Sequence, residues 1–305
     1  MITGIHHVTA IASDPQSNID FYAGVLGLRL VKTTINYDDP GMYHFYYGDG
    51  AGRPGTILTF FPIPGARRGR VGTGQVVETA LSIPVGATDF WRERLTERDI
   101  ALEDRGSALA FVDPDGLPLV LTEVNDDPRP GDNGAVGIPA EYAIRGIDSV
   151  TLQVAQASPT LELLTERMGF AISGAGTGRF TAGADVSGNA LYLQEAEAGD
   201  AHGLSGAGTV HHVAFRLPDN AEQTRWHDEL TALGYHVSPI MDRQYFHSIY
   251  YREPGGILFE LATDPPGFLA DGEAADTLGK RLQLPPGLEA EREIIEAHLP
   301  QLRVS

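Results

Sequence analysis

The chain has 305 residues, 42% of them hydrophobic, which allows about two globular domains with sizeable cores. Its 41 acidic and 22 basic residues give a net charge of −19, which argues against a nucleic-acid partner because phosphate binding depends on basic patches. The absence of cysteine excludes disulfides, thiolate metal sites and cysteine nucleophiles, and it suits a reducing compartment. With no basic and apolar leader and no apolar run long enough to cross a membrane, a cytoplasmic location is expected.

Four stretches of the chain repeat one pattern, in which an alternating hydrophobic strand stands directly before a helix start. Two copies contain a histidine pair: GIHHVTAIA at 4–12 and TVHHVAFRL at 209–217. GIDSVTLQV at 146–154 has the same shape without histidines, and ETALSIPVG at 78–86 is a fainter copy. β-type sequence follows each predicted helix. The pattern predicts the order strand, helix, strand, strand, strand, repeated four times at roughly 55 to 80 residues per copy.

Helix boundary signals support this order. Residues suited to a helix cap or first turn follow three of the opening strands: Pro15, Pro159 and Asp219. Glycines stand where a left-handed helix stop is wanted: Gly27, Gly169 and Gly234. The predicted fold class is therefore α+β, with four βαβββ modules in two domains. The expected boundaries are a domain at 1–125, a Pro/Gly-rich linker at 126–145, a domain at 146–263 and a tail with a charged helix at 264–305.

Ligand-type side chains occupy three of eight positions that the four modules have in common. Aligned by eye, these positions hold, on the opening strands, His7, Thr79, Ser149 and His212, and, on the final strands, Thr59, Val120, Tyr192 and Glu260. The good metal ligands His7, His212 and Glu260 all belong to the first and fourth modules. We therefore expect these two modules to pair around one cavity.

A histidine in a strand is usually a hydrogen-bonded core or edge residue, so neither His7 nor His212 alone predicts a metal. Glu260 changes the balance because it lies in the apolar run ILFELA, where an unpaired carboxylate would cost several kcal/mol. A metal, an arginine or water could each satisfy it. Two imidazoles and one carboxylate are the makings of a metal centre with open coordination positions, which favours the metal.

Four segments resemble a known family: GIHHVT, LVKTTINYDDPGMYHFYYGDGAGRPGTILTFFP, VHHVAF and DRQYFHSIYYREPGGILFE. Over about residues 4 to 270, the chain resembles the vicinal oxygen chelate superfamily, which includes glyoxalase I, bleomycin-resistance proteins and catechol extradiol dioxygenases. Within it, the chain is most similar to hydroquinone and chlorohydroquinone ring-cleaving dioxygenases. The resemblance implies Fe(II) held by His7, His212 and Glu260, with a small aromatic substrate and O2 as partners. It also implies roles beside the metal for Thr9, Arg243, Tyr250, His6 and His211.

Each of these residues has a simpler alternative role. Tyr250 is the candidate proton donor and Arg243 would orient it or stabilise negative charge, but each could instead only pack or pair with a surface acid. His44 could point into the first-module cavity, although a hydrogen-bonded core histidine is more common. The charged tail helix would be a surface brace or a contact in a homo-oligomer.

The favoured function is a ring-cleaving dioxygenase that inserts both atoms of O2 into hydroquinone-type substrates. The polar groups expected to hold the far hydroxyl of such a substrate are Arg243, Tyr245, His247 and Tyr250. Catechol-type extradiol cleavage is one alternative. A glyoxalase-like lyase or isomerase is a second, although it would normally want a fourth ligand where Thr59 stands. A metal-free binding protein of the resistance type is a third, for which the triad would be surplus.

Overall fold

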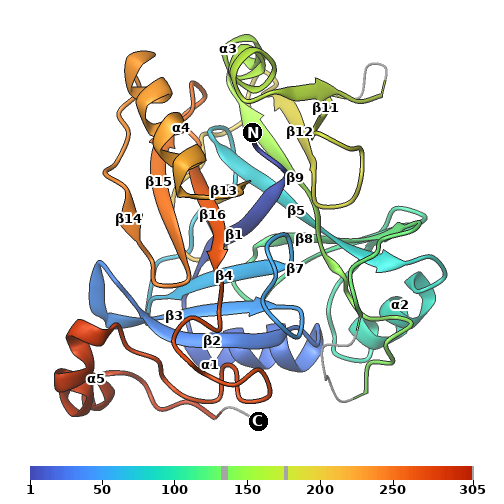
Figure 1. The fold of residues 1–305 in the computed structure, drawn as a ribbon. Coiled ribbons are helices and arrows are strands. Elements are labelled where there is room, and N and C mark those ends of the chain that lie inside the picture. The colour runs from blue at the N-terminus through green and yellow to red at the C-terminus, as the bar shows by residue number, and fades with distance from the viewer. Residues whose placement is uncertain (132–136, 175–177, 304–305) are drawn as a thin grey trace.

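The computed structural model describes residues 1–131, 137–174 and 178–303 of the chain. The fold is α+β, with two eight-stranded sheets that are each made from two βαβββ modules (Figure 1). The predicted fold class and fourfold repeat are therefore confirmed. None of the helices in the described ranges has the length and apolarity that a membrane span requires.

The first two modules follow each other directly along the chain. The first consists of β1 (Ile5–Ala12), α1 (Pro15–Ile19) with a π-helical turn (Asp20–Val25), β2 (Arg29–Asn36), β3 (Asp39–Gly48) and β4 (Ile57–Pro62). The second consists of β5 (Gln75–Pro84), α2 (Thr88–Thr96), β6 (Glu103–Asp104), β7 (Ala108–Val112) and β8 (Pro118–Val124).

The other two modules follow the expected linker. The third consists of β9 (Gly146–Val154), α3 (Ala157–Glu162) with a π-helical turn (Leu163–Arg167), β10 (Phe170–Ile172), β11 (Arg179–Ala182) and β12 (Ala190–Glu195). The fourth consists of β13 (Thr209–Leu217), α4 (Asn220–Ala232), β14 (Met241–Asp242), β15 (Phe246–Arg252) and β16 (Leu258–Pro266). A 3-10 turn (Pro286–Glu291) and α5 (Arg292–His298) end the described chain.

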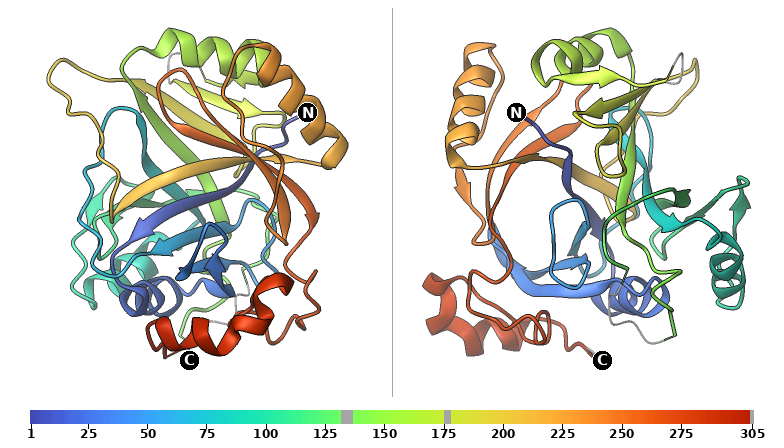
Figure 2. Two further views of the ribbon diagram at one scale, coloured as in Figure 1. Left: turned by 90° about the vertical axis from the view of Figure 1, so that its left-hand side faces the viewer. Right: turned by 45° about the vertical axis from the view of Figure 1, so that its right-hand side comes forward.

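The sheets combine modules from the two halves of the chain. One sheet has the order β14-β15-β16-β13-β1-β4-β3-β2, and the other has the order β10-β11-β12-β9-β5-β8-β7-β6. The first module therefore pairs with the fourth through antiparallel β1 and β13, as the ligand positions predicted, and the second pairs with the third through β5 and β9. The first sheet curls strongly, so that its fourth-module strands face its first-module strands (Figure 2).

The predicted helix boundaries are confirmed. Asp219 caps α4, where its carboxylate accepts from the amide of Glu222, and Pro15 opens α1. Pro159 lies in the first turn of α3, which begins at Ala157. Glycines with positive φ follow the helices at the predicted stops: Gly27 (66°), Gly169 (75°) and Gly234 (88°).

The expected linker at 126–145 runs between β8 and β9, and its residues 132–136 lie outside the described ranges. The tail expected from residue 264 includes the last residues of β16, and its residues 304–305 also lie outside. The described tail braces the first sheet. The ammonium of Lys32 on β2 is fully buried against the carboxylates of Asp271 (2.8 Å) and Glu273 (2.5 Å), and the hydroxyl of Tyr43 on β3 donates to the carbonyl of Pro300.

Arg129, in the linker, connects the two sheets. Its guanidinium donates to the carbonyl of Gly55, before β4, and to that of Ile147 in β9, each at 2.8 Å. It also donates to the hydroxyl of Ser82 in β5 and to the carboxylate of Asp127. The Asp127 side chain is only 4% exposed, so its charge depends on this arginine.

Replacing Arg129 by alanine is expected to lower the free energy of unfolding by about 3 kcal/mol, because the Asp127 carboxylate would remain buried without its cation. Urea unfolding followed by circular dichroism measures this change. Arg92→Ala is the matched control, since Arg92 pairs with Asp89 and Asp104 on the surface and should change stability little. Equal effects of the two substitutions would contradict the proposed role of Arg129.

Candidate metal centre

Three adjacent strands of the first sheet bring the predicted ligands together. β1 carries His7, β13 carries His212 and β16 carries Glu260, with exposures of 2%, 4% and 0%. The Nε2 atoms of the two histidines lie 3.3 Å apart. The Glu260 Oε2 atom lies 3.2 Å from the Nε2 of His7 and 2.8 Å from that of His212. Among the described residues, these three form the one group of donor atoms close enough to share a metal ion.

The spacing of these donors fits a metal with open positions. Bonds of about 2.1 Å separate neighbouring donors by about 3.0 Å in an octahedron and by about 3.4 Å in a tetrahedron. The observed separations of 2.8, 3.2 and 3.3 Å lie around these two values, and three donors leave further positions open in either geometry. Within the described ranges, the Oε2 of Glu260 also lacks a well-aligned hydrogen bond. A buried acceptor normally has a partner, and a bound cation would supply one here. The triad could therefore bind a metal ion.

The electrostatics of the triad suit metal binding. Burial would raise the pKa of Glu260, but the adjacent His7 and His212 outweigh it and hold the pKa well below its ordinary range. Burial lowers the pKa of His212, an effect that Glu260 only partly offsets. The site therefore presents a carboxylate beside a neutral His212 imidazole, the protonation states in which these groups bind metals.

Each ligand histidine is held by the histidine before it. The Nδ1 atoms of His6 and His7 are 2.9 Å apart, and those of His211 and His212 are 2.8 Å apart. If the ligand ring donates its Nδ1 proton across each short contact, its Nε2 lone pair is left facing Glu260. The geometry thus places His6 and His211 beside the triad, as the resemblance implied. His6 is buried, whereas His211 is exposed.

Ser248 is a further polar partner that the sequence reasoning missed. Its hydroxyl donates to the Oε1 of Glu260 at 2.5 Å, which leaves Oε2 facing the histidines. Ser248 and Tyr250 alternate on β15, so they face the same side of the sheet. Because Tyr250 pairs with Glu260 across the strands, this alternation was the sequence signal that could have identified Ser248.

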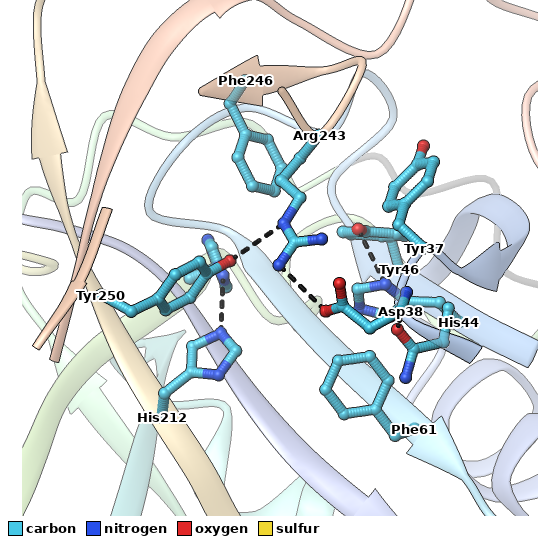
Figure 3. Close-up of a pocket in the computed structure, with 11 residues that line it drawn as sticks. Tyr37, Asp38, His44, Tyr46, Phe61, His212, Arg243, Phe246 and Tyr250 are labelled. Carbon is cyan, nitrogen blue, oxygen red and sulfur yellow. Dashed lines mark hydrogen bonds and ion pairs between the residues drawn. The ribbon is translucent and has the colours of Figure 1, made fainter. Parts of the chain in front are cut away.

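A small pocket opens beside the triad between the first and fourth modules (Figure 3). Tyr46 and Phe61 from the first module and Phe246 from the fourth supply aromatic walls. His44 also lines the pocket, and both of its ring nitrogens make hydrogen bonds. His44 is therefore a fully hydrogen-bonded histidine that also lines the pocket.

Tyr250 and Arg243 lie next to each other in this pocket (Figure 3). The Arg243 Nε donates to the Tyr250 hydroxyl oxygen at 3.3 Å, and its Nη2 lies 3.1 Å from a carboxylate oxygen of Asp38. Burial, with a contribution from Glu260, raises the pKa of Tyr250, so the phenol keeps its proton. Since arginine can only donate, that proton remains available to the pocket.

Two expected pocket residues lie elsewhere. The Tyr245 ring is fully buried against Phe268, and its hydroxyl donates to the carboxylate of Asp271. His247 lies between Phe246 and Ser248 on β15, and strand alternation turns it away from the triad towards α4, whose Gln223 binds its carbonyl. Sequence proximity to Arg243 suggested both residues, but neither Tyr245 nor His247 lines this pocket. Asp38 and His44 supply polar groups from the opposite wall.

The strand register also corrects one aligned position. In the first sheet, His7 pairs with the residue two positions beyond His212. The same offset from Ser149 in the second sheet leads to Glu78, not to Thr79. The second module has no histidine pair to mark its register, and a one-residue slip along an alternating strand is hard to detect from sequence.

Glu78 does not create a second centre. Its carboxylate pairs with Arg105 at 2.8 Å, and the aligned positions around it hold Val120, Ser149 and Tyr192, whose side chains are poor metal ligands. The second sheet therefore keeps the strand arrangement without the donors.

The sequence profile described as the Glyoxalase/Bleomycin resistance protein/Dioxygenase superfamily matches residues 4–121 and 146–261. The chain belongs to this superfamily. The resemblance seen in the sequence motifs is thereby confirmed. The two matched stretches correspond to the two halves of the chain, each of which supplies two βαβββ modules.

Three relatives show how far the similarity extends. "Putative ring-cleaving dioxygenase MhqO" of Bacillus subtilis is 45% identical over 97% of this chain and 95% of the relative. "Chlorohydroquinone/hydroquinone 1,2-dioxygenase" of Sphingobium indicum is 32% identical over 94% of this chain and 93% of the relative. A crystal structure of a "putative dioxygenase" from Bacillus subtilis matches with a TM-score of 0.91 and 44% identity, over 100% of this chain and 98% of that one.

Replacing any one of the three triad residues by alanine is expected to abolish tight binding of a divalent metal, because the described chain offers no other donor close enough to substitute. Metal analysis after anaerobic loading with Fe(II) and gel filtration measures the occupancy. His227→Ala is the matched control, since this histidine lies on α4 outside the centre. Full occupancy in His7→Ala, His212→Ala or Glu260→Ala would show that the triad is not the metal site.

Proposed function

We propose that this protein is an Fe(II)-dependent dioxygenase that opens the ring of hydroquinone-type aromatics and incorporates both atoms of O2. The observation that carries the proposal is the buried triad of two histidines and one carboxylate facing an aromatic-lined pocket. This donor set with open positions is the one that non-haem Fe(II) oxygenases use. The near full-length similarity to proteins named as ring-cleaving dioxygenases supports the reaction, and the more distant hydroquinone dioxygenase supports the substrate class.

In the proposed reaction, His7, His212 and Glu260 hold the iron, which lowers the pKa of a substrate hydroxyl and supplies the redox chemistry for O2. The protein supplies position and exclusion of water. Tyr46, Phe61 and Phe246 give the substrate ring an apolar slot next to the triad. Because side chains of the first and fourth modules form the slot, a substrate can bind there only when these two modules are packed together.

Tyr250 is the proposed proton donor. Its ring centroid is 5.6 Å from that of His212, and Arg243 donates to its hydroxyl oxygen, which leaves the phenol O–H as a donor. Arg243 fixes the phenol and adds positive charge on the side where the reactant gains negative charge. Asp38, which contacts Arg243, keeps the guanidinium in place from the opposite module.

Two other functions are disfavoured by particular contacts. In a glyoxalase-like lyase a fourth ligand would stand where Thr59 lies, but the Thr59 hydroxyl is hydrogen-bonded to Thr9 and His44. In a metal-free binding protein nothing would require the Glu260 carboxylate to be buried at 0% exposure between two histidines. The hydrogen-bonded Thr59 hydroxyl argues against the lyase, and the buried Glu260 carboxylate argues against the metal-free protein. Both contacts suit a metal centre with open positions.

Removing the Tyr250 hydroxyl tests the proton donor. Tyr250→Phe is expected to keep its iron and to lower kcat on the order of 10²-fold, the typical loss when a general acid is deleted. Oxygen uptake under saturating substrate measures the rate. Tyr251→Phe is the matched control, because this neighbour on β15 is buried on the other face with its hydroxyl near Met168. An unchanged kcat in Tyr250→Phe would return the residue to a packing role.

The substrate class is tested with hydroquinone, methylhydroquinone, chlorohydroquinone and catechol under air. We expect kcat/KM to be at least about tenfold higher for the para-dihydroxybenzenes, because a site that hydrogen-bonds a far hydroxyl rejects analogues lacking it. Arg243, Asp38, Asn36 and Tyr37 are among the polar groups that line the pocket beyond the triad. A preference for catechol would indicate the extradiol branch, and turnover of methylglyoxal–thiol adducts alone would indicate a lyase.

A further inference from the structure

Four buried side chains form a continuous chain of hydrogen bonds beside the triad. The Thr9 and Thr59 hydroxyls are 2.9 Å apart, and the Thr59 hydroxyl is 2.7 Å from the Nε2 of His44. The Nδ1 of His44 is 2.9 Å from the Tyr46 hydroxyl. Thr9 and Thr59 are 0% exposed, Tyr46 is 1% exposed and His44 is 8% exposed, so water does not compete strongly for these bonds.

This chain starts at Thr9, beside the triad. Thr59 occupies on β4 the register position that Glu260 occupies on β16. Its side chain is shorter and carries a hydroxyl where the other module supplies the Glu260 carboxylate. Thr9 lies two residues after His7 on the same face of β1 and pairs across the strands with His212. Among the described side chains, Thr59 is the hydrogen-bond partner found for the Thr9 hydroxyl.

The hydrogen-bond chain can run in two directions. Thr59 and His44, the two inner members, each donate one hydrogen bond and accept another. In one direction the hydroxyl proton of Thr9 has no acceptor within the chain, and in the other direction the hydroxyl proton of Tyr46 has none. A phenol is a stronger donor than an alcohol, and an imidazole nitrogen is the strongest acceptor present. Tyr46 therefore donates to Nδ1 of His44, whose Nε2 proton goes to Thr59, which in turn donates to Thr9.

The imidazole must be neutral for this direction. Burial lowers the pKa of His44 well below its ordinary value, and the neighbouring His7 and His212 add to this effect. Contacts with two tilted aromatic rings also hold the imidazole, whose centroid lies 4.1 Å from that of Tyr46 and 4.4 Å from that of Phe61. Both nitrogens of His44 are engaged, so it has no free atom with which to act on a substrate directly.

We propose that Tyr46 and His44 are positioning residues that act through Thr59 to aim the Thr9 hydroxyl proton at the open side of the triad. Thr9 then donates a hydrogen bond to the reactant oxygen that enters there. The identity of that reactant rests on the proposed function, whereas the direction of the hydrogen-bond chain does not.

The direction is tested without turnover. Long-range ¹H–¹⁵N NMR of the full-length protein with Zn(II) in the site distinguishes the two neutral tautomers of an imidazole, and His44→Gln assigns the signal. We expect His44 to carry its proton on Nε2 across neutral pH. Tyr46→Phe should broaden or shift this signal, because Nδ1 loses its donor. A proton on Nδ1, or a protonated ring, would overturn the proposal.

Kinetics then test whether Tyr46 acts through Thr9. Tyr46→Phe, Thr59→Val and Thr9→Val should each keep full iron occupancy and lower kcat about tenfold, the worth of one well-placed hydrogen bond. The Thr9→Val/Tyr46→Phe double variant should be no slower than Thr9→Val alone. Tyr43→Phe, which removes a hydroxyl from the same strand outside the site, is the matched control and should leave kcat unchanged.

Each outcome is decisive. If the losses in Thr9→Val and Tyr46→Phe multiply in the double variant, Tyr46 does not act through Thr9 and the proposal is wrong. If the wild-type protein cleaves no aromatic substrate, the proposed function fails, while the His44 tautomer still confirms or rejects the direction of the hydrogen bonds.

Discussion

The burial of the Glu260 carboxylate is the constraint on which the rest of the site depends. An anion at 0% exposure in the middle of a sheet is tolerated only beside hydrogen-bond donors or a cation, and the two histidines that face it come from neighbouring strands. That arrangement requires β1 to lie against β13, which in turn brings the first module beside the fourth. The pocket, its aromatic walls and the Arg243–Asp38 contact all lie on this same junction.

The two modules contribute different things to the junction. The fourth supplies two of the three triad residues together with Tyr250, Arg243 and Ser248. The first supplies one ligand and, where a fourth could have been, hydroxyl groups tied to an imidazole. Two modules with the same strand pattern therefore enclose a site whose ligand-type residues come mainly from one of them, and a metal held there would keep open coordination positions.

Much of the fold and of the triad could be predicted from the sequence, because alternating strands and ligand-type side chains both recur at corresponding positions of the modules. The histidine pairs and Glu260 predicted which modules would pair, and glycines and caps marked the helix ends. Sequence reasoning went wrong where the deciding contact was distant or unmarked. The aligned position in the second module was placed at about Thr79, one residue from Glu78, because no histidine marked that strand. Tyr245 was assigned to the pocket, but its hydroxyl donates to Asp271 in the tail instead. The network of His44, Thr59 and Tyr46 joins two strands whose facing residues only the register reveals.

The order of the strands has a consequence for how the protein is made. The second sheet joins modules that follow each other along the chain, so it can assemble while synthesis continues. The first sheet must wait, since His7 and His212 are 205 positions apart. Throughout most of translation the histidines at the start of the chain have no partners, and β1 is an unpaired edge exposed to other chains. The last module to leave the ribosome therefore both protects that edge and completes the candidate metal site.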